Sequence, residues 1–273
     1  MGWRQRFEDR PLIMGVLNIT PDSFYDGGRY YAPGAAVEHA LHLAEEGADI
    51  IDVGGESTRP SAEATSVEEE LGRVIPVIKG IRTRSNVFIS IDTYKARVAH
   101  EAVDAGADMI NDISGLSFDN KIGEVAAESK VPVVIMHIKG TPKEMQVNPN
   151  YDDVIGEIKG FFEERVVFAK QCGIEEDNMI LDPGIGFGKR LQDNLMIIKE
   201  LRRFKELGKP ILIGTSMKAF IGKLAGSPDL EARVEGTLAS VALSLWNGAD
   251  IVRVHDVKKA RRVATLVHAV MKV

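Results

Sequence analysis

The chain has 273 residues, and its 40 acidic and 34 basic side chains leave a formal net charge of −6. This charge argues against a general binder of nucleic acid or of acidic membranes, although it allows a local cationic pocket. Hydrophobic residues make up 44% of the chain, which is enough for a large core. We expect one domain over residues 1–273, because α/β barrels often reach about 250 residues as a single unit.

The single cysteine, Cys172, excludes an intramolecular disulfide and any zinc site built from several cysteines. The first eight residues lack the apolar stretch of a signal peptide. No window of the sequence reaches the roughly 18 apolar residues of a membrane helix. We therefore expect a cytoplasmic protein with no membrane partner and no nucleic-acid partner.

A short unit, Gly-Ala-Asp followed by an apolar run, occurs three times, starting at Gly47, Gly106 and Gly248. Each glycine is suited to end a helix, and each apolar run is suited to a buried strand. Similar runs bounded by polar, glycine or proline residues complete a set of eight predicted strands. In chain order the strands cover residues 12–17, 50–53, 87–91, 109–112, 133–136, 179–181, 211–213 and 251–254.

Amphipathic stretches with helical spacing lie between these strands. The clearest cover residues 35–46, 67–82, 96–105, 152–171 and 194–207, with an apolar helix at 236–246. Strands that alternate with helices predict a parallel sheet, and eight such units in one chain predict a single (β/α)8 TIM barrel. Long loops after strands one, two and five lie at its C-terminal face, where barrel enzymes keep their sites: residues 20–33, 54–66 and 137–150.

Polar residues end nearly every predicted strand. A polar group inside an apolar run is costly unless it is paired. Any one of these residues can be satisfied by its neighbours and the loop backbone, but together they predict a binding ring at the mouth of the barrel. The ring consists of Asn18, Asp52, Asp92, Asn111, Asp112, His137, Asp182, Ser216, Arg253 and His255.

The chemistry of this ring is mixed. Asp92, Asn111 and Asp182 offer acceptors and an amide, which suit the donor-rich edge of a flat heterocycle. Cations that suit phosphate or diphosphate come later in the chain: Lys218, Arg253 and His255. The histidines lack the HxH or HExxH spacing of a metallohydrolase. The glycine-rich segment at 182–188 is interpreted as a turn that approaches a flat ligand, with a plain tight turn as the alternative.

Two segments carry a more specific pattern: Gly-Val-Leu-Asn-Ile-Thr-Pro-Asp-Ser-Phe at residues 15–24 and Asp-Val-Gly-Gly-Glu-Ser-Thr-Arg-Pro at residues 52–60. Shorter matches occur at residues 90–93, 111–112, 136–137, 181–188 and 253–256. With these segments the chain resembles the dihydropteroate synthases. The resemblance implies a transferase that condenses 6-hydroxymethyl-7,8-dihydropterin diphosphate with p-aminobenzoate in folate biosynthesis and releases diphosphate.

The resemblance also implies a role for each site residue. The pterin would be held by Asp92, Asn111, Met136, Asp182, Gly186, Phe187 and Lys218. The diphosphate would be held by Asn18, Thr58, Arg253 and His255, with Asn18 as a ligand of Mg²⁺. p-Aminobenzoate would be enclosed by Phe24, Thr58, Arg59, Pro60, Phe187 and Ala219. Catalysis would depend on Asp26, Lys218, Arg253 and His255. Family members are commonly dimers, so a homodimer is expected, with the helix at 236–246 as a candidate interface.

One segment departs from the family pattern, because this chain has Ser216-Met217-Lys218-Ala219 where the family has Ser-Arg-Lys-Ser. The lysine is kept, but a cation and a hydroxyl near the expected p-aminobenzoate carboxylate are lost. A helix N-terminus at this point can still favour that carboxylate. We therefore predict a weaker or altered p-aminobenzoate site and an altered response to sulfonamides.

An aromatic amine is a serviceable nucleophile, so the demanding step is the departure of diphosphate, and we expect a dissociative path in which Asp26 stabilises the cationic CH₂. Two other functions remain open. A folate-dependent methyltransferase would use a similar ring without a diphosphate site, and residues 18–22, 57–60 and 253–255 argue against it. A pterin binder that has lost catalysis is the second alternative, to which Met217 and Ala219 lend slight support.

Overall fold

The computed structural model describes residues 3–7, 9–20, 33–58, 64–226 and 229–273, and in these residues eight parallel strands form a closed barrel. The strands pair in the order β6-β5-β4-β3-β2-β1-β8-β7, and a parallel bridge between Leu181 and Ile211 joins β6 to β7. The predicted barrel is confirmed. Its strands are β1 (Leu12–Asn18), β2 (Ile50–Gly54), β3 (Phe88–Asp92), β4 (Met109–Asp112), β5 (Val133–Met136), β6 (Met179–Asp182), β7 (Leu212–Ile213) and β8 (Ile251–Val254).

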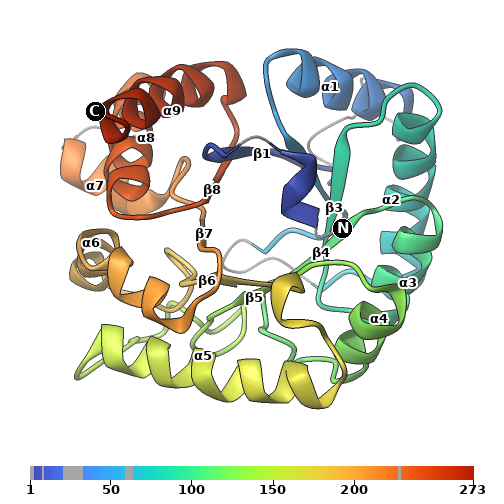
Figure 1. The fold of residues 1–273 in the computed structure, drawn as a ribbon, viewed down its shortest axis with the longest axis horizontal. Helices are drawn as coiled ribbons and strands as arrows, with labels where there is room; N and C mark the ends of the chain where they lie inside the picture. The colour runs from blue at the N-terminus through green and yellow to red at the C-terminus, as the bar shows by residue number, and fades with distance from the viewer. Residues whose placement is uncertain (1–2, 8, 21–32, 59–63, 227–228) are drawn as a thin grey trace.

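Helices surround the strands as an outer ring (Figure 1). They are α1 (Pro33–Glu45), α2 (Val67–Arg82), α3 (Ala96–Asp104), α4 (Lys121–Ser129), α5 (Val154–Gln171), α6 (Leu191–Lys199), α7 (Ala219–Ala225), α8 (Leu230–Trp246) and α9 (Val257–Met271). The 3₁₀ helices are η1 (Trp3–Arg6), η2 (Glu176–Asn178) and η3 (Leu201–Leu207). None of the helices in the described ranges is long and apolar enough to cross a membrane.

The prediction of one helix over residues 194–207 is wrong. Helix α6 begins earlier, at Leu191, because the Asp193 carboxylate accepts a hydrogen bond from the Arg190 backbone N–H at 2.8 Å and caps the first turn. It ends at Lys199, and the chain continues as η3. The tighter 3₁₀ turn aligns positions i and i+3, and it buries Leu201 and Phe204 together.

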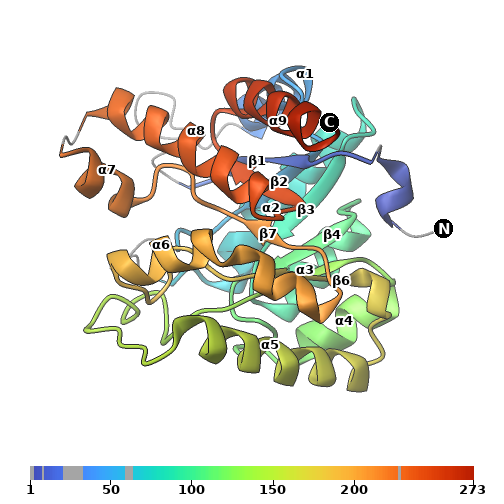
Figure 2. The same ribbon diagram turned by 60° about the vertical axis from the view of Figure 1, so that its left-hand side comes forward.

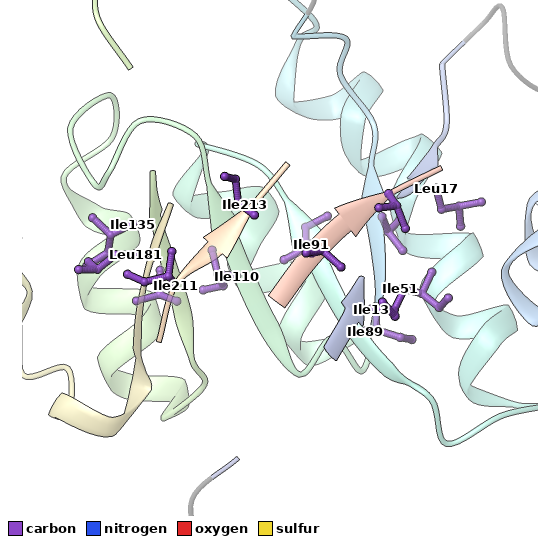
Figure 3. Packing of buried hydrophobic residues seen from close by; sticks show 14 of the residues in the cluster. Ile13, Leu17, Ile51, Ile89, Ile91, Ile110, Ile135, Leu181, Ile211 and Ile213 are labelled. Atoms are coloured by element: carbon purple, nitrogen blue, oxygen red, sulfur yellow. The ribbon is translucent and has the colours of Figure 1, made fainter. Parts of the chain in front are cut away.

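Side chains alternate along each strand between the layer beneath the helices and the barrel interior. Outward residues such as Ile13, Ile89 and Ile135 pack with the helices in the larger core cluster (Figure 3). Inward residues form a second cluster that includes Trp3 of η1, which lies at the opposite end of the barrel from α7 (Figure 2). The inward strand residues of this cluster are Leu12, Met14, Ile50, Phe88, Met109, Val134, Ile180, Leu212 and Ile251.

The same alternation places polar residues above this apolar interior. Residues i and i+2 of a strand face the same side, so the residue two positions after an inward apolar side chain also faces the barrel interior. In these short strands that second residue lies at the carboxyl end. This relation connects Ile50 to Asp52, Met109 to Asn111, Val134 to Met136, Ile180 to Asp182, and Ile251 to Arg253. The interior therefore changes from apolar to polar at the height where a ligand can enter.

The threefold Gly-Ala-Asp unit has a structural role at the N-terminal ends of the strands. Its glycines have φ between +102° and +115°, the left-handed region that favours glycine after a helix. In each copy the aspartate accepts a hydrogen bond from the backbone N–H of a neighbouring strand: Asp49 from Ile13 (2.8 Å), Asp108 from Ile89 (2.9 Å) and Asp250 from Ile211 (2.7 Å). Basic side chains bind the same three carboxylates: Arg10 and Arg261, Arg82, and Lys205.

Candidate active site

A cavity of about 250 Å³ lies at the carboxyl ends of the strands. Seven of the ten residues of the predicted ring line it: Asn18, Asp92, Asn111, Asp182, Ser216, Arg253 and His255. Four further residues that the resemblance implied also line it: Thr58, Met136, Phe187 and Lys218. We call this space the inner cavity. The structure thus brings together residues from six strands and four loops that are far apart in the sequence.

An ion-pair network forms one side of the inner cavity. The buried Asp52 accepts from Arg253 Nε at 2.6 Å and from Asn111 Nδ2 at 3.0 Å, both through its Oδ2 atom. Arg253 also donates from Nη2 to Asp92 Oδ2 at 2.7 Å. Because Asp52 takes the amide N–H of Asn111, the amide oxygen is left to accept from a ligand. Asp52 therefore orients two cavity residues although it does not line the cavity itself.

Two carboxylates offer acceptors to a ligand in the inner cavity. The turn after β6 holds Asp182, whose Oδ1 accepts from the Gly184 N–H at 2.7 Å. Burial raises the pKa of Asp182 to about 6, and burial likewise raises the pKa of Asp92 although Arg253 opposes the shift. The protonation states of Asp182 and Asp92 near neutral pH therefore depend on the ligand that binds beside them. A ligand that donates hydrogen bonds would favour their charged forms.

Lys218 provides a second basic side chain in the lining of the inner cavity. It precedes the first turn of α7, and its Nζ lies 4.4 Å from the centre of the Phe187 ring. Burial and the nearby Arg253 lower its pKa to about 8. The preceding residue, Met217, has φ of +58°, which costs free energy in any residue except glycine. With the backbone in this conformation, Met217 and Lys218 both line the cavity although they are consecutive.

His255 and Ser216 form a hydrogen-bonded pair near the cavity mouth. Ser216 Oγ lies 2.9 Å from His255 Nδ1 and accepts from the His255 backbone N–H at 3.2 Å. The histidine ring is exposed, whereas the serine is buried. The pair can present an imidazole N–H to an anion at the entrance.

A second cavity of about 610 Å³, here called the outer cavity, adjoins the inner one. The two cavities share a wall that consists of Thr58, Phe187, Met217 and Lys218. Ala219, implied for p-aminobenzoate, lines only the outer cavity, and so does Gly186, which the resemblance implied for the pterin. Basic side chains also line the outer cavity: Arg190, Lys223 and Lys189, whose pKa is lowered to about 7 by burial. The arrangement can hold two ligands in contact, and it favours an anionic ligand in the outer cavity.

Besides Asp52, two members of the predicted ring do not line the cavity: Asp112 and His137. Asp112 follows Asn111, so it points to the opposite side of the strand, where it accepts from the Ser114 N–H at 2.8 Å and the Leu116 N–H at 2.7 Å. His137 is buried, and burial lowers its pKa to about 2. Its Nδ1 lies 2.9 Å from Lys189 Nζ. Both residues stabilise the turns that carry the site.

Four predicted site residues lie outside the described part of the chain: Phe24, Asp26, Arg59 and Pro60. Sequence reasoning, in turn, missed several residues of the site. Glu56 lines the inner cavity, and the buried Lys189 donates to the Phe187 carbonyl at 3.0 Å and holds the glycine-rich turn against β5. Lys189 follows the glycines directly in sequence, and that position is the only signal that could have drawn attention to it.

The donor set at Asn18 is suited to Mg²⁺. Asn18 Oδ1 and Asp92 Oδ2 lie 3.7 Å and 3.6 Å from the position that a Cβ atom at Gly54 would take, so both oxygens lie close to the carboxyl end of β2. No group of three or more His, Cys, Asp or Glu side chains that could hold a metal occurs in the described residues. Mg²⁺ commonly uses one or two protein oxygens and completes its shell with water and substrate phosphates. The residues present fit that pattern.

Comparisons with known proteins agree with this geometry. A model of the pterin binding enzyme family matches residues 14–255. The dihydropteroate synthase of Bacillus subtilis is 49% identical over 265 residues, which cover 97% of this chain and 90% of that protein. The structure of Xanthomonas albilineans dihydropteroate synthase with 4-aminobenzoic acid has a TM-score of 0.91 and 46% identity, and covers 97% of this chain and 94% of its own. Yersinia pestis dihydropteroate synthase with a sulfonamide drug has a TM-score of 0.90 and 41% identity, with 96% and 94% coverage. The chain therefore belongs to the dihydropteroate synthase family of pterin binding enzymes.

Proposed function

We propose that this protein condenses 6-hydroxymethyl-7,8-dihydropterin diphosphate with p-aminobenzoate to form 7,8-dihydropteroate and diphosphate. The observation that carries the proposal is the pair of adjoining cavities with a common wall at Phe187 and Lys218. The inner cavity offers carboxylates and an amide, while the outer cavity offers cations. A pterin in the first and an anionic aromatic amine in the second would meet at this wall, as the condensation requires.

The inner cavity residues are suited to the pterin ring. Asp182 and Asp92 would accept from its amino and ring N–H groups, and Asn111 would accept through its amide oxygen. Lys218 would donate to the oxo group while its position over Phe187 keeps it at the cavity wall. Met136 would pack against the ring. Pterin binding would displace part of the Arg253–Asp92 bond, which frees a guanidinium N–H for the diphosphate.

The diphosphate end would lie toward Asn18, His255 and Arg253. Mg²⁺ held by Asn18 would neutralise negative charge on the diphosphate oxygens. His255 and Arg253 would donate to the same group, because a leaving anion is stabilised by donors that are already in place. Thr58 lies on the shared wall, and its hydroxyl would donate to either ligand.

We propose a dissociative reaction order at the CH₂ group. The C–O bond to diphosphate breaks first and leaves a cation conjugated with the pterin ring. The amine nitrogen of p-aminobenzoate then forms the C–N bond and loses its proton to water. Asp26, which lies between β1 and α1 in the sequence, would stabilise the cation. An isotope effect that shows bond formation concerted with departure of diphosphate would exclude this order.

The proposed activity is tested by diphosphate release from the pterin substrate with Mg²⁺, with and without p-aminobenzoate. The proposed synthase requires both the metal and the amine for steady turnover. A folate-dependent methyltransferase would release no diphosphate, and a pterin binder would hold the ligand without turnover. Sulfonamides compete as analogues of p-aminobenzoate, so we also propose that they inhibit this protein, with an affinity altered by Met217 and Ala219.

We further propose that the protein is a cytoplasmic homodimer. Helices α8 and α9 pack together and carry large apolar side chains that are more than half exposed: Leu243, Trp246, Leu266 and Val270. A second copy that covers this face would remove them from water. Light scattering should give twice the chain mass, and Trp246→Glu should give the monomer. A monomeric wild type would refute the dimer. Cell fractionation can test the proposed compartment.

A further inference from the structure

A buried cluster of charged side chains lies beneath the loop that joins β2 to α2. At its centre, Lys95 Nζ donates to Glu56 Oε2 at 2.5 Å, to Glu70 Oε2 at 2.5 Å and to the Thr65 carbonyl at 2.7 Å. The exposed fractions of the Lys95, Glu56 and Glu70 side chains are 14%, 10% and 1%. Charges at this depth are retained only when they are paired, so the lysine is the group that allows two carboxylates to lie here.

The cluster bonds both ends of the loop to the same framework. Glu56 Oε1 accepts from the Thr65 N–H at 3.3 Å and from the Tyr94 hydroxyl at 3.0 Å. Arg73 Nη1 donates to the Gly55 carbonyl at 2.7 Å and approaches Thr65 Oγ1 at 3.4 Å. Residues 55–56 at the start of the loop and Thr65 near its end are thus held by side chains of α2 and of the turn after β3.

Close packing at Gly55 fixes the path by which the chain leaves β2. A Cβ atom at this position would lie 2.8 Å from Val74 Cγ1 and 2.9 Å from Glu70 Cγ. Only glycine allows the backbone to approach α2 this closely. The next residues, Ser57 and Thr58, line the inner cavity, and Thr58 also lines the outer one. Their position depends on the anchored residues immediately before them.

We propose that Lys95, Glu56 and Glu70 form a clasp that positions Ser57 and Thr58 at the wall shared by the two cavities. Lys95 lines neither cavity, so it is a positioning residue for the second substrate. The inference rests on the proposed function, because it assigns the outer cavity to p-aminobenzoate. Without the ammonium, two neighbouring carboxylates would repel each other, and Glu56 would move out toward solvent with the start of the loop.

The test compares Lys95→Met with Arg97→Met. Arg97 lies two residues further on α3, is 60% exposed, and pairs with Glu68 of α2, so its loss removes an α2–α3 ion pair without touching the clasp. For Lys95→Met we expect the KM for p-aminobenzoate to rise about tenfold or more, with kcat reduced less than about threefold. The Kd for 6-hydroxymethyl-7,8-dihydropterin, which lacks the diphosphate, should stay within about twofold, because the clasp does not hold the pterin residues. Arg97→Met should leave all three values unchanged, and Lys95→Arg should recover most of the KM.

Several outcomes would overturn the clasp. An unchanged KM in Lys95→Met would do so, as would an equal rise in Arg97→Met or a parallel loss of pterin affinity. If Lys95→Met does not fold, Lys95→Gln provides the same test, because it removes the ammonium at a residue that lines neither cavity and leaves an amide N–H in the cluster. A wild-type protein that is inactive with p-aminobenzoate would overturn the proposed function itself, whereas an active wild type with an unaffected Lys95→Met variant overturns the clasp alone.

Discussion

Asp52→Asn tests whether a buried carboxylate outside the cavity controls ligand binding. Asp52 is fully buried and accepts from both Arg253 and Asn111. Removal of one partner from a buried ion pair costs about 3–5 kcal/mol. The Arg253 side chain is 23% exposed and keeps its bond to Asp92, so we expect a smaller loss of about 1–3 kcal/mol in the free energy of unfolding. Urea unfolding measures this loss.

The same substitution should weaken pterin binding. With Asp52 neutral, Asp92 becomes the only carboxylate that holds Arg253, and a pterin must compete with the guanidinium for it. A hydrogen bond to a charged group contributes about 1.5–3 kcal/mol, so the Kd for 6-hydroxymethyl-7,8-dihydropterin should rise about 10- to 100-fold in calorimetry. Asp112→Asn is the matched control, since Asp112 is equally buried but points away from the cavity. A wild-type Kd in Asp52→Asn, or an equal rise in the control, would refute this reasoning.

Three further variants test the site. Burial raises the Asp182 pKa from 3.8 to about 6, so pterin affinity should fall as the pH drops through 6 and the carboxylate is protonated. In the free protein the same shift lowers the free energy of unfolding as the pH rises from about 4 to above 6, because the buried carboxylate is then charged. Asp182→Asn should therefore gain about 1–3 kcal/mol in unfolding free energy at pH 7 and lose pterin binding; a destabilised variant would contradict this. Gly184→Ala should lose about 2–4 kcal/mol, because φ is +67° and a Cβ would lie 2.0 Å from a backbone carbonyl oxygen, whereas Gly34→Ala, with open space around it, should lose nothing in the same unfolding assay. The double variant Met217→Arg and Ala219→Ser should lower the KM for p-aminobenzoate about tenfold, and an unchanged KM would exclude the predicted defect.

The barrel and most of the inner cavity could be predicted from the sequence, because both follow from the alternation of side chains along buried strands. The same alternation explains the errors. Asn111 and Asp112 are consecutive, so only one of them can face the interior, and His137 follows the inward-facing Met136. Which of two neighbours points inward depends on register, and a strand of four residues does not reveal its register alone.

Contacts between loops and across the barrel could not be predicted. Arg253 and Asp52 are 201 positions apart, and their ion pair depends on closure of the barrel. The bonds of Lys95 and Lys189 depend on the paths of loops, which have no periodicity. The roles implied for Asp26, Phe24, Arg59 and Pro60, the Mg²⁺ ligand and the single-domain organisation stay predictions.

The Gly-Ala-Asp units divide the barrel into paired strands. Asp49, before β2, holds β1; Asp108, before β4, holds β3; Asp250, before β8, holds the chain at β7. Before β6, the amide of Asn178 donates to the Lys130 carbonyl at 3.2 Å, next to β5. Hydrogen bonds therefore join the strands in the pairs β1–β2, β3–β4, β5–β6 and β7–β8, at the end of the barrel opposite the cavities. A circular permutant with its new termini between two strand pairs, for example between β2 and β3, keeps each of these hydrogen bonds within one continuous segment of chain. New termini within a pair, for example between β1 and β2, place an aspartate and its backbone partner at opposite ends of the chain. The units therefore mark where the chain can be cut and rejoined with the least loss, independently of the chemistry at the other end.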